Sequence, residues 1–176
     1  PTLRQLLANQ QFNGKHLIIE IKHGAHFEAI GVDPIQEVKA LLEQSDWSNR
    51  GMKISLESFE FEFLLRAKLE IGPELNYVFL SARDTLPEGI TELTDELLAE
   101  IADNFDAVSV AMSMVLTGDL VARAKKIGLE IYAFTARLET AEGNVEKWFE
   151  RLVSTGVDGI FADQPDLLLK TVADLT

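Results

Sequence analysis

Six short apolar runs alternate with amphipathic helical patterns along the chain, and this alternation constrains the fold more than any other feature. The runs predict strands over residues 17–22, 53–59, 76–82, 106–112, 130–136 and 159–162. Apolar residues at helical spacing predict helices after Thr2 and over residues 34–43, 60–70, 91–105, 120–127, 145–155 and 165–175. Strands that alternate with helices over short connections indicate an α/β protein with a parallel sheet and helical crossovers.

Two α/β architectures fit this pattern. The length of 176 residues predicts a single domain over residues 1–176. A doubly wound sheet fits the length, but such sheets usually carry a glycine-rich phosphate loop after the first strand, and residues 22–26 (KHGAH) are not such a loop. A (β/α)8 TIM barrel needs eight units and typically about 250 residues, so six units would be a barrel without its first quarter. Composition does not choose between the two.

Charge and composition exclude several classes of partner. The net charge of −13 argues against nucleic acid or an anionic membrane surface, because phosphate groups attract Lys and Arg. No cysteine is present for a disulfide or a thiolate metal site. No apolar run approaches the ~18 residues of a transmembrane segment, and no signal peptide opens the sequence. These features fit a cytoplasmic protein without excluding an exported one, and the first residue, Pro1, fits either removal of Met or a piece of a longer protein.

The first predicted strand, residues 17–22, ends in an acid and a base. Glu20 and Lys22 are two residues apart, so their side chains share one face of the strand. In parallel α/β proteins, catalytic and binding groups collect at the carboxyl ends of the strands. A structural ion pair between Glu20 and Lys22 is the simpler alternative to a functional site.

Five motifs at characteristic spacings carry a family resemblance. They are Pro1-Thr2-Leu3, Ile19-Glu20-Ile21-Lys22, Ser58-Phe59-Glu60, Gly128-Leu129 with Phe134-Thr135-Ala136-Arg137, and the closing run from Gly156 to Asp166. In this order they resemble the glycerophosphodiester phosphodiesterase family, and the resemblance covers the whole chain. The closing run is the most distinctive of the five.

The resemblance implies a (β/α)8 TIM barrel of which this chain contains about six of the eight βα units, from the third strand onward. Family members carry a His-Arg-Gly motif on the first strand, a Glu-x-Asp motif on the second and a catalytic His shortly after it. This chain begins at the Pro-Thr-Leu that follows those motifs, and His-Arg occurs nowhere in it. The catalytic histidines are therefore expected outside this chain.

The resemblance also implies roles for individual residues. Glu20 would bind a divalent cation, Mg²⁺ or Ca²⁺, and Lys22 would contact the phosphate of the substrate. Hard cations prefer carboxylate oxygens, and positive charge stabilises the phosphoryl oxygens during transfer. Further substrate contacts are expected at Ser58, Phe134 and Arg137. A helix cap for Ser58 and an ordinary surface position for Arg137 are the alternatives.

Other polar residues are expected to have structural roles. His23 and His26 lie three apart in residues 23–33, which are predicted as a loop, and loop histidines are usually solvated rather than metal ligands. Asp163 and Asp166 flank Pro165 and are expected to cap the last helix.

Three functions remain open. The first is hydrolysis of a glycerophosphodiester to an alcohol and glycerol 3-phosphate by a protein of which this chain supplies part, the chain alone being inactive. The second is a degenerate barrel that acts as a binding or scaffold module, and the third is an unrelated nucleotide- or sugar-phosphate-binding domain. If the barrel is incomplete, its flanking strands would expose unpaired edges, so self-association or completion by an N-terminal fragment is expected.

Overall fold

The computed structural model describes residues 1–141 and 143–175. The chain forms two compact units, Pro1–Phe79 and Leu80–Thr176, and each is described by itself. The expectation of a single domain stays a prediction.

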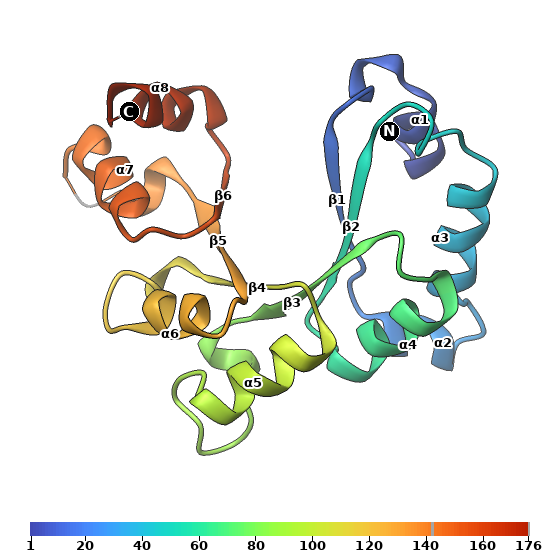
Figure 1. Ribbon diagram of the computed structural model, residues 1–176, viewed down its shortest axis with the longest axis horizontal. Coiled ribbons are helices and arrows are strands. Elements are labelled where there is room, and N and C mark those ends of the chain that lie inside the picture. Colours follow the sequence, from blue (N-terminus) through green and yellow to red (C-terminus); the bar gives the residue numbers. More distant parts are fainter. Residues whose placement is uncertain (142, 176) are drawn as a thin grey trace. The chain divides into compact units, whose positions relative to one another are not determined.

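Strands and helices alternate as the sequence pattern predicts (Figure 1). Within the described residues the six strands are β1 (His16–Glu20), β2 (Lys53–Ser58), β3 (Asn76–Ser81), β4 (Ala107–Ala111), β5 (Glu130–Ala136) and β6 (Gly159–Ala162). The strands follow one another in the sheet in chain order. Each predicted strand is confirmed to within two residues at either end, because short apolar runs with β-branched and aromatic residues favour strands.

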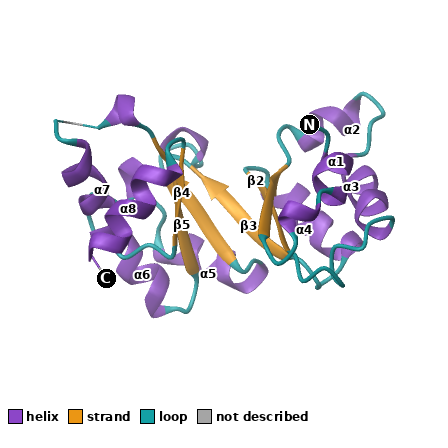
Figure 2. Ribbon diagram, turned by 90° about the horizontal axis from the view of Figure 1, so that it is seen from above, coloured by secondary structure: helices purple, strands orange, loops and turns teal. Residues whose placement is uncertain are grey.

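The first unit contains β1, β2, most of β3 and the helices between them. Its helices are α1 (Leu3–Ala8), α2 (Gly24–Ala29), α3 (Pro34–Glu43) and α4 (Phe61–Ile71), with a 3-10 turn, η1 (Gln10–Phe12). Strand β1 is parallel to β2, with His16 opposite Lys53 and Glu20 opposite Glu57. In Figures 1 and 2, α1, α3 and α4 all lie on one side of the β1–β2 pair. Leu7, Ile35, Leu56 and Leu64 are buried in this unit.

The second unit repeats the same arrangement with β4, β5 and β6. Its helices are α5 (Asp95–Asn104), α6 (Leu120–Lys126), α7 (Val145–Ser154) and α8 (Pro165–Leu175), with 3-10 turns η2 (Arg83–Thr85), η3 (Met112–Met114) and η4 (Leu138–Thr140). Strand β5 pairs in parallel with β4 and β6, and its register with β6 shifts between Ala133 and Ala136. Its largest buried side chains include Phe149, Leu98, Ile131 and Leu152.

The prediction of a loop over residues 23–33 is wrong in its first half. Helix α2 begins at Gly24, directly after His23, which occupies the N-cap position with a left-handed φ of 55°. A glycine in a sequence often indicates a turn or loop, and Gly24 therefore favours a loop prediction. In the structure, His23 with its positive φ and Gly24 instead turn the chain from β1 into a helix. The rest of the segment leads to Asp33, which caps α3.

Replacing Asp33 by alanine is expected to destabilise the protein by about 1 kcal/mol. The Asp33 carboxylate accepts hydrogen bonds at 3.1 Å from the backbone N–H groups of Ile35 and Gln36, and alanine leaves both without that partner. Urea unfolding measures the loss, and Asp33→Asn, which keeps an acceptor oxygen, serves as the control. Equal losses in both variants would show that the charge, rather than the cap, is responsible.

Candidate functional site

Two glutamates lie side by side at the carboxyl ends of β1 and β2. Glu20 is the last residue of β1, and Glu57 is its register partner on β2. Side chains of register partners in parallel strands point to the same face of a sheet, and neighbouring strands are only about 4.8 Å apart. The carboxyl end of β1 therefore presents two carboxylates on one face.

Lys22 pairs with the first of these glutamates. Its Nζ lies 3.3 Å from Oε2 of Glu20, and the Lys22 side chain is 68% exposed while that of Glu20 is 26% exposed. This is the ion pair that the sequence offered as the simpler alternative. An exposed pair of this kind contributes at most about 1 kcal/mol to stability, so the pair is compatible with a further role for either residue.

Glu57 is the buried member of the group. Only 7% of the residue is exposed, and its Oε2 has no hydrogen-bond partner among the described residues. Burial raises the pKa of Glu57 to about 7, with the nearby charge of Glu20 adding to the rise and Lys22 opposing it. Glu57 is not among the site residues predicted from the sequence. The available signal was an acid inside the apolar run at 53–59.

Ser58 points to the opposite face from Glu57. It is buried, donates a 3.0 Å hydrogen bond to the carbonyl of Ile21 and accepts one at 3.2 Å from the N–H of Glu60, the residue that caps α4. Because side chains alternate along a strand, Glu20 and Glu57 point away from the side on which Ser58 meets the start of α4. The hydrogen bonds of Ser58 favour the structural alternative that the sequence left open.

The other two predicted substrate residues lie in the second unit. Phe134 is half-buried near the carboxyl end of β5, and Arg137 follows that strand. Nε of Arg137 lies 3.1 Å from Oδ2 of Asp163, and both side chains are about half exposed. Asp163 thus forms an ion pair with Arg137, and its expected role as a cap of the last helix stays a prediction. Arg137 is held at the carboxyl end of β5 with a guanidinium still open to solvent.

The two histidines near Glu20 have structural positions. His23 occupies the N-cap position of α2 without a side-chain capping hydrogen bond, and His26 lies within that helix, where its ring packs edge-on against Phe27. Over residues 1–141 and 143–175, no group of three or more His, Asp or Glu side chains is arranged to hold a metal ion. Glu20 and Glu57 are therefore a pair of carboxylates, which is fewer protein ligands than a closed cation site has.

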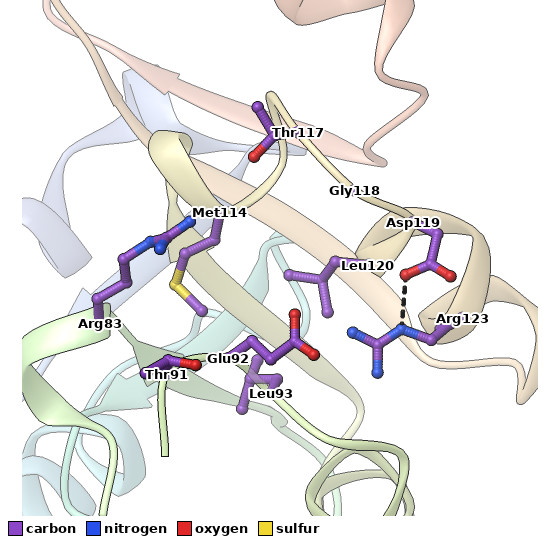
Figure 3. Close-up of a pocket in the computed structure, with 10 residues that line it drawn as sticks. All are labelled: Arg83, Thr91, Glu92, Leu93, Met114, Thr117, Gly118, Asp119, Leu120 and Arg123. Carbon is purple, nitrogen blue, oxygen red and sulfur yellow. Dashed lines mark hydrogen bonds and ion pairs between the residues drawn. The ribbon is translucent and has the colours of Figure 1, made fainter. Parts of the chain in front are cut away.

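A separate small cavity of about 110 Å³ lies in the second unit (Figure 3). Two of its charged lining residues pair with each other, because Nε of Arg123 lies 2.9 Å from Oδ1 of Asp119, and Arg123 also lies 2.9 Å from Asp95 outside the lining. The cavity is lined by Arg83, Thr91, Glu92, Leu93, Met114, Thr117, Gly118, Asp119, Leu120 and Arg123. The predicted site residues are not part of this lining.

The chain is a parallel α/β protein that carries charged residues, Glu20, Lys22 and Glu57, at the carboxyl ends of its first two strands. The sequence matches the profile of the glycerophosphoryl diester phosphodiesterase family over residues 1–167. The chain therefore belongs to this family, and the resemblance drawn from its motifs is confirmed. No curated protein matches the sequence.

Solved structures support the fold. A protein from Silicibacter pomeroyi DSS-3 with the provisional name glycerophosphoryl diester phosphodiesterase has a TM-score of 0.75 and 24% identity, over 99% of this chain and 57% of its own. A glycerophosphodiester phosphodiesterase from Parabacteroides distasonis ATCC 8503 has a TM-score of 0.66 and 19% sequence identity, over 100% of this chain and 66% of its own. A glycerophosphodiester phosphodiesterase from Agrobacterium tumefaciens C58 has a TM-score of 0.61 and 19% sequence identity, over 96% of this chain and 60% of its own.

These matches confirm the predicted fold class. Among the described residues, six parallel strands alternate with helices as consecutive βα units of a TIM barrel of this family's type. The chain spans between 57% and 66% of the length of these three proteins. No helix in the described part of the chain is both long enough and apolar enough to cross a bilayer.

Proposed function

We propose that this chain carries part of the active site of a phosphodiesterase that hydrolyses a glycerophosphodiester to an alcohol and glycerol 3-phosphate. The observation that supports this most is the placement of Glu20 and Lys22, together with Glu57, at the carboxyl ends of neighbouring parallel strands. That end of a barrel is where its enzymes build their sites. Membership of the family supplies the reaction class.

Glu20 is proposed as a ligand of a divalent cation, and Lys22 as the group that contacts the phosphate. The chemistry of the donors fits such a cation, because carboxylate oxygens are the ligands that Mg²⁺ and Ca²⁺ prefer and Glu57 adds a second carboxylate beside Glu20. When bound, the cation would polarise the phosphoryl oxygens and neutralise developing negative charge. Lys22 is exposed enough to meet a substrate from solvent while its partner Glu20 fixes its position.

Arg137 and Phe134 are proposed as further substrate contacts from the end of β5. The exposed guanidinium of Arg137 suits a phosphate or a hydroxyl, and Asp163 orients it. Phe134 offers an apolar surface for the carbon skeleton of the glycerol group. Ser58 remains a candidate only through its backbone position, since its hydroxyl already makes two hydrogen bonds.

The acid–base histidines are proposed to come from residues outside this sequence, because the chain contains no His-Arg-Gly motif. We propose that a segment with that motif and the Glu-x-Asp motif completes the protein, and that without it the chain associates with itself. The exposed leucines of α8, among them Leu169 at 67% exposure, are consistent with a missing partner surface.

The test is a comparison of this chain with a chimera in which the His-Arg-Gly and Glu-x-Asp segment of a family member precedes Pro1. We expect no release of glycerol 3-phosphate from glycerophosphocholine by the chain alone. The chimera is expected to turn over the substrate in the presence of Mg²⁺ or Ca²⁺, and Glu20→Gln in the chimera should lower turnover by about 100-fold, as loss of a metal-site group does.

Glu37→Gln, on the exposed face of α3, is the matched control and should leave turnover unchanged. Cation-dependent turnover by the chain alone that survives purification would contradict the external origin of the histidines. A chimera with native circular dichroism and no turnover would contradict the proposed reaction.

A further inference from the structure

Glu57 stands out among the buried polar residues of β2 because its Oε2 has no hydrogen-bond partner among the described residues. Ser58 makes two hydrogen bonds, and Oγ of Ser55 lies 2.8 Å from Nε2 of His16. Glu57 is also buried, with 7% of the residue exposed. Its Oε2 nevertheless has no hydrogen-bond partner in the described chain. A buried carboxylate without a partner is rare unless it binds something.

The position of this unpartnered oxygen points to a cation. Glu57 is the register partner of Glu20, so the two carboxylates extend from neighbouring strands on the same face. Two carboxylates on strands about 4.8 Å apart can reach one cation, since metal–oxygen distances are about 2.0–2.6 Å. Without a cation the two would repel each other.

Lys22 does not supply the positive charge that Glu57 lacks. Its Nζ pairs with Oε2 of Glu20, and its side chain is largely exposed, whereas Glu57 lies on the buried side of the pair. The described chain thus provides one positive charge at the rim for two neighbouring carboxylates. A divalent cation between them would give the inner carboxylate the partner that it lacks.

We infer that Glu57 is a second protein ligand, beside Glu20, of a divalent-cation site at the carboxyl ends of β1 and β2. This inference rests on the proposed role of Glu20 as a cation ligand. The preferred class is a hard, oxygen-binding ion such as Mg²⁺, Ca²⁺ or Mn²⁺, with water or substrate oxygens in the remaining positions. Glu57 then acts as a cation ligand and makes no contact with the substrate itself.

The experiment is a Mn²⁺ titration of the purified chain, in which electron paramagnetic resonance measures free Mn²⁺ at mildly alkaline pH. The chain itself is expected to bind one Mn²⁺ with millimolar affinity or better, displaceable by Mg²⁺ or Ca²⁺. Glu57→Gln and Glu20→Gln keep the side-chain size and are each expected to weaken binding by about tenfold or more. Glu37→Gln, on α3, is the control and should bind as the unchanged chain does.

The outcomes separate the inference from the proposed function. Weakened binding in Glu20→Gln but not in Glu57→Gln would overturn the role of Glu57 and leave Glu20 as the ligand. Unchanged binding in both variants, or no binding by the unchanged chain, would overturn both assignments. Circular dichroism of each variant, recorded with the titration, shows that any loss of binding belongs to a folded protein.

Discussion

Glu57→Gln is expected to make the protein more stable at pH 8 by up to about 3 kcal/mol, and to change its stability little near pH 4. Burial raises the pKa of the Glu57 carboxyl from 4.5 to about 7, and the charge of Glu20 adds to the rise. Glutamine has nearly the same shape and carries no charge. It therefore removes the penalty of burying an ionised carboxylate next to a second one.

The direction follows from the two pKa values. Above pH 4.5 the unfolded chain ionises at Glu57 while the folded chain keeps the proton until about pH 7, so ionisation favours the unfolded state. Stability is therefore lost as pH rises from about 4.5 to about 7 and is constant above that range. In the glutamine variant this loss is absent, so the difference between the two proteins grows across the same window.

Urea unfolding of both proteins at about pH 5 and about pH 8 measures this difference. Glu37→Gln, which removes an exposed carboxylate from α3, is the control and should show no such pH-dependent gain. A Glu57→Gln protein that is less stable than the original at pH 8 would mean that the ionised carboxylate has a favourable partner in the folded state.

Gly24→Ala is expected to destabilise the protein by about 1–3 kcal/mol, the usual range for overpacking a core. A Cβ at Gly24 would lie 2.4–2.5 Å from three ring carbons of Phe63, which is itself 5% exposed. Alanine is otherwise the better helix former by about 1 kcal/mol. A loss of protein stability in Gly24→Ala would therefore come from the clash with the Phe63 ring, because helix propensity alone would favour alanine.

The companion variants are Phe63→Leu and the double variant with Gly24→Ala. Leucine at 63 removes the ring that meets the new methyl group, so the double variant should be more stable than the sum of the single losses predicts. Urea unfolding of all four proteins gives this coupling energy. Additive losses would show that the ring moves aside freely and that the glycine is not required by packing.

The strands were predictable because each carries its information in its own residues. Short runs rich in apolar, aromatic and β-branched residues, such as those at 76–82 and 130–136, favour strands wherever they occur. Helix α2 was not predictable in this way. Its start depends on a left-handed His23, and its packing depends on the ring of Phe63, which is far away in sequence.

Of the three charged residues in the candidate site, the two that lie on one strand could be predicted from the sequence and the third could not. Glu20 and Lys22 are neighbours on one strand, so alternation alone places them together, and their ion pair confirms that placement. Glu57 joins them only through the register of β1 with β2, which a single stretch of sequence does not contain. An acid within a buried apolar run is the general signal for such residues.

Pairing between consecutive strands also has a consequence for how the polypeptide reaches its native state. In the first unit β2 pairs with β1 and β3, and in the second β5 pairs with β4 and β6, so each strand meets a partner one βα unit away in sequence. Each pairing closes a loop that contains a whole crossover helix. The entropy cost of closure rises only slowly with loop length, although parallel pairing of this kind still forms more slowly than a local hairpin. Growth can then proceed vectorially from the amino terminus during translation, each new unit docking on an edge already in place.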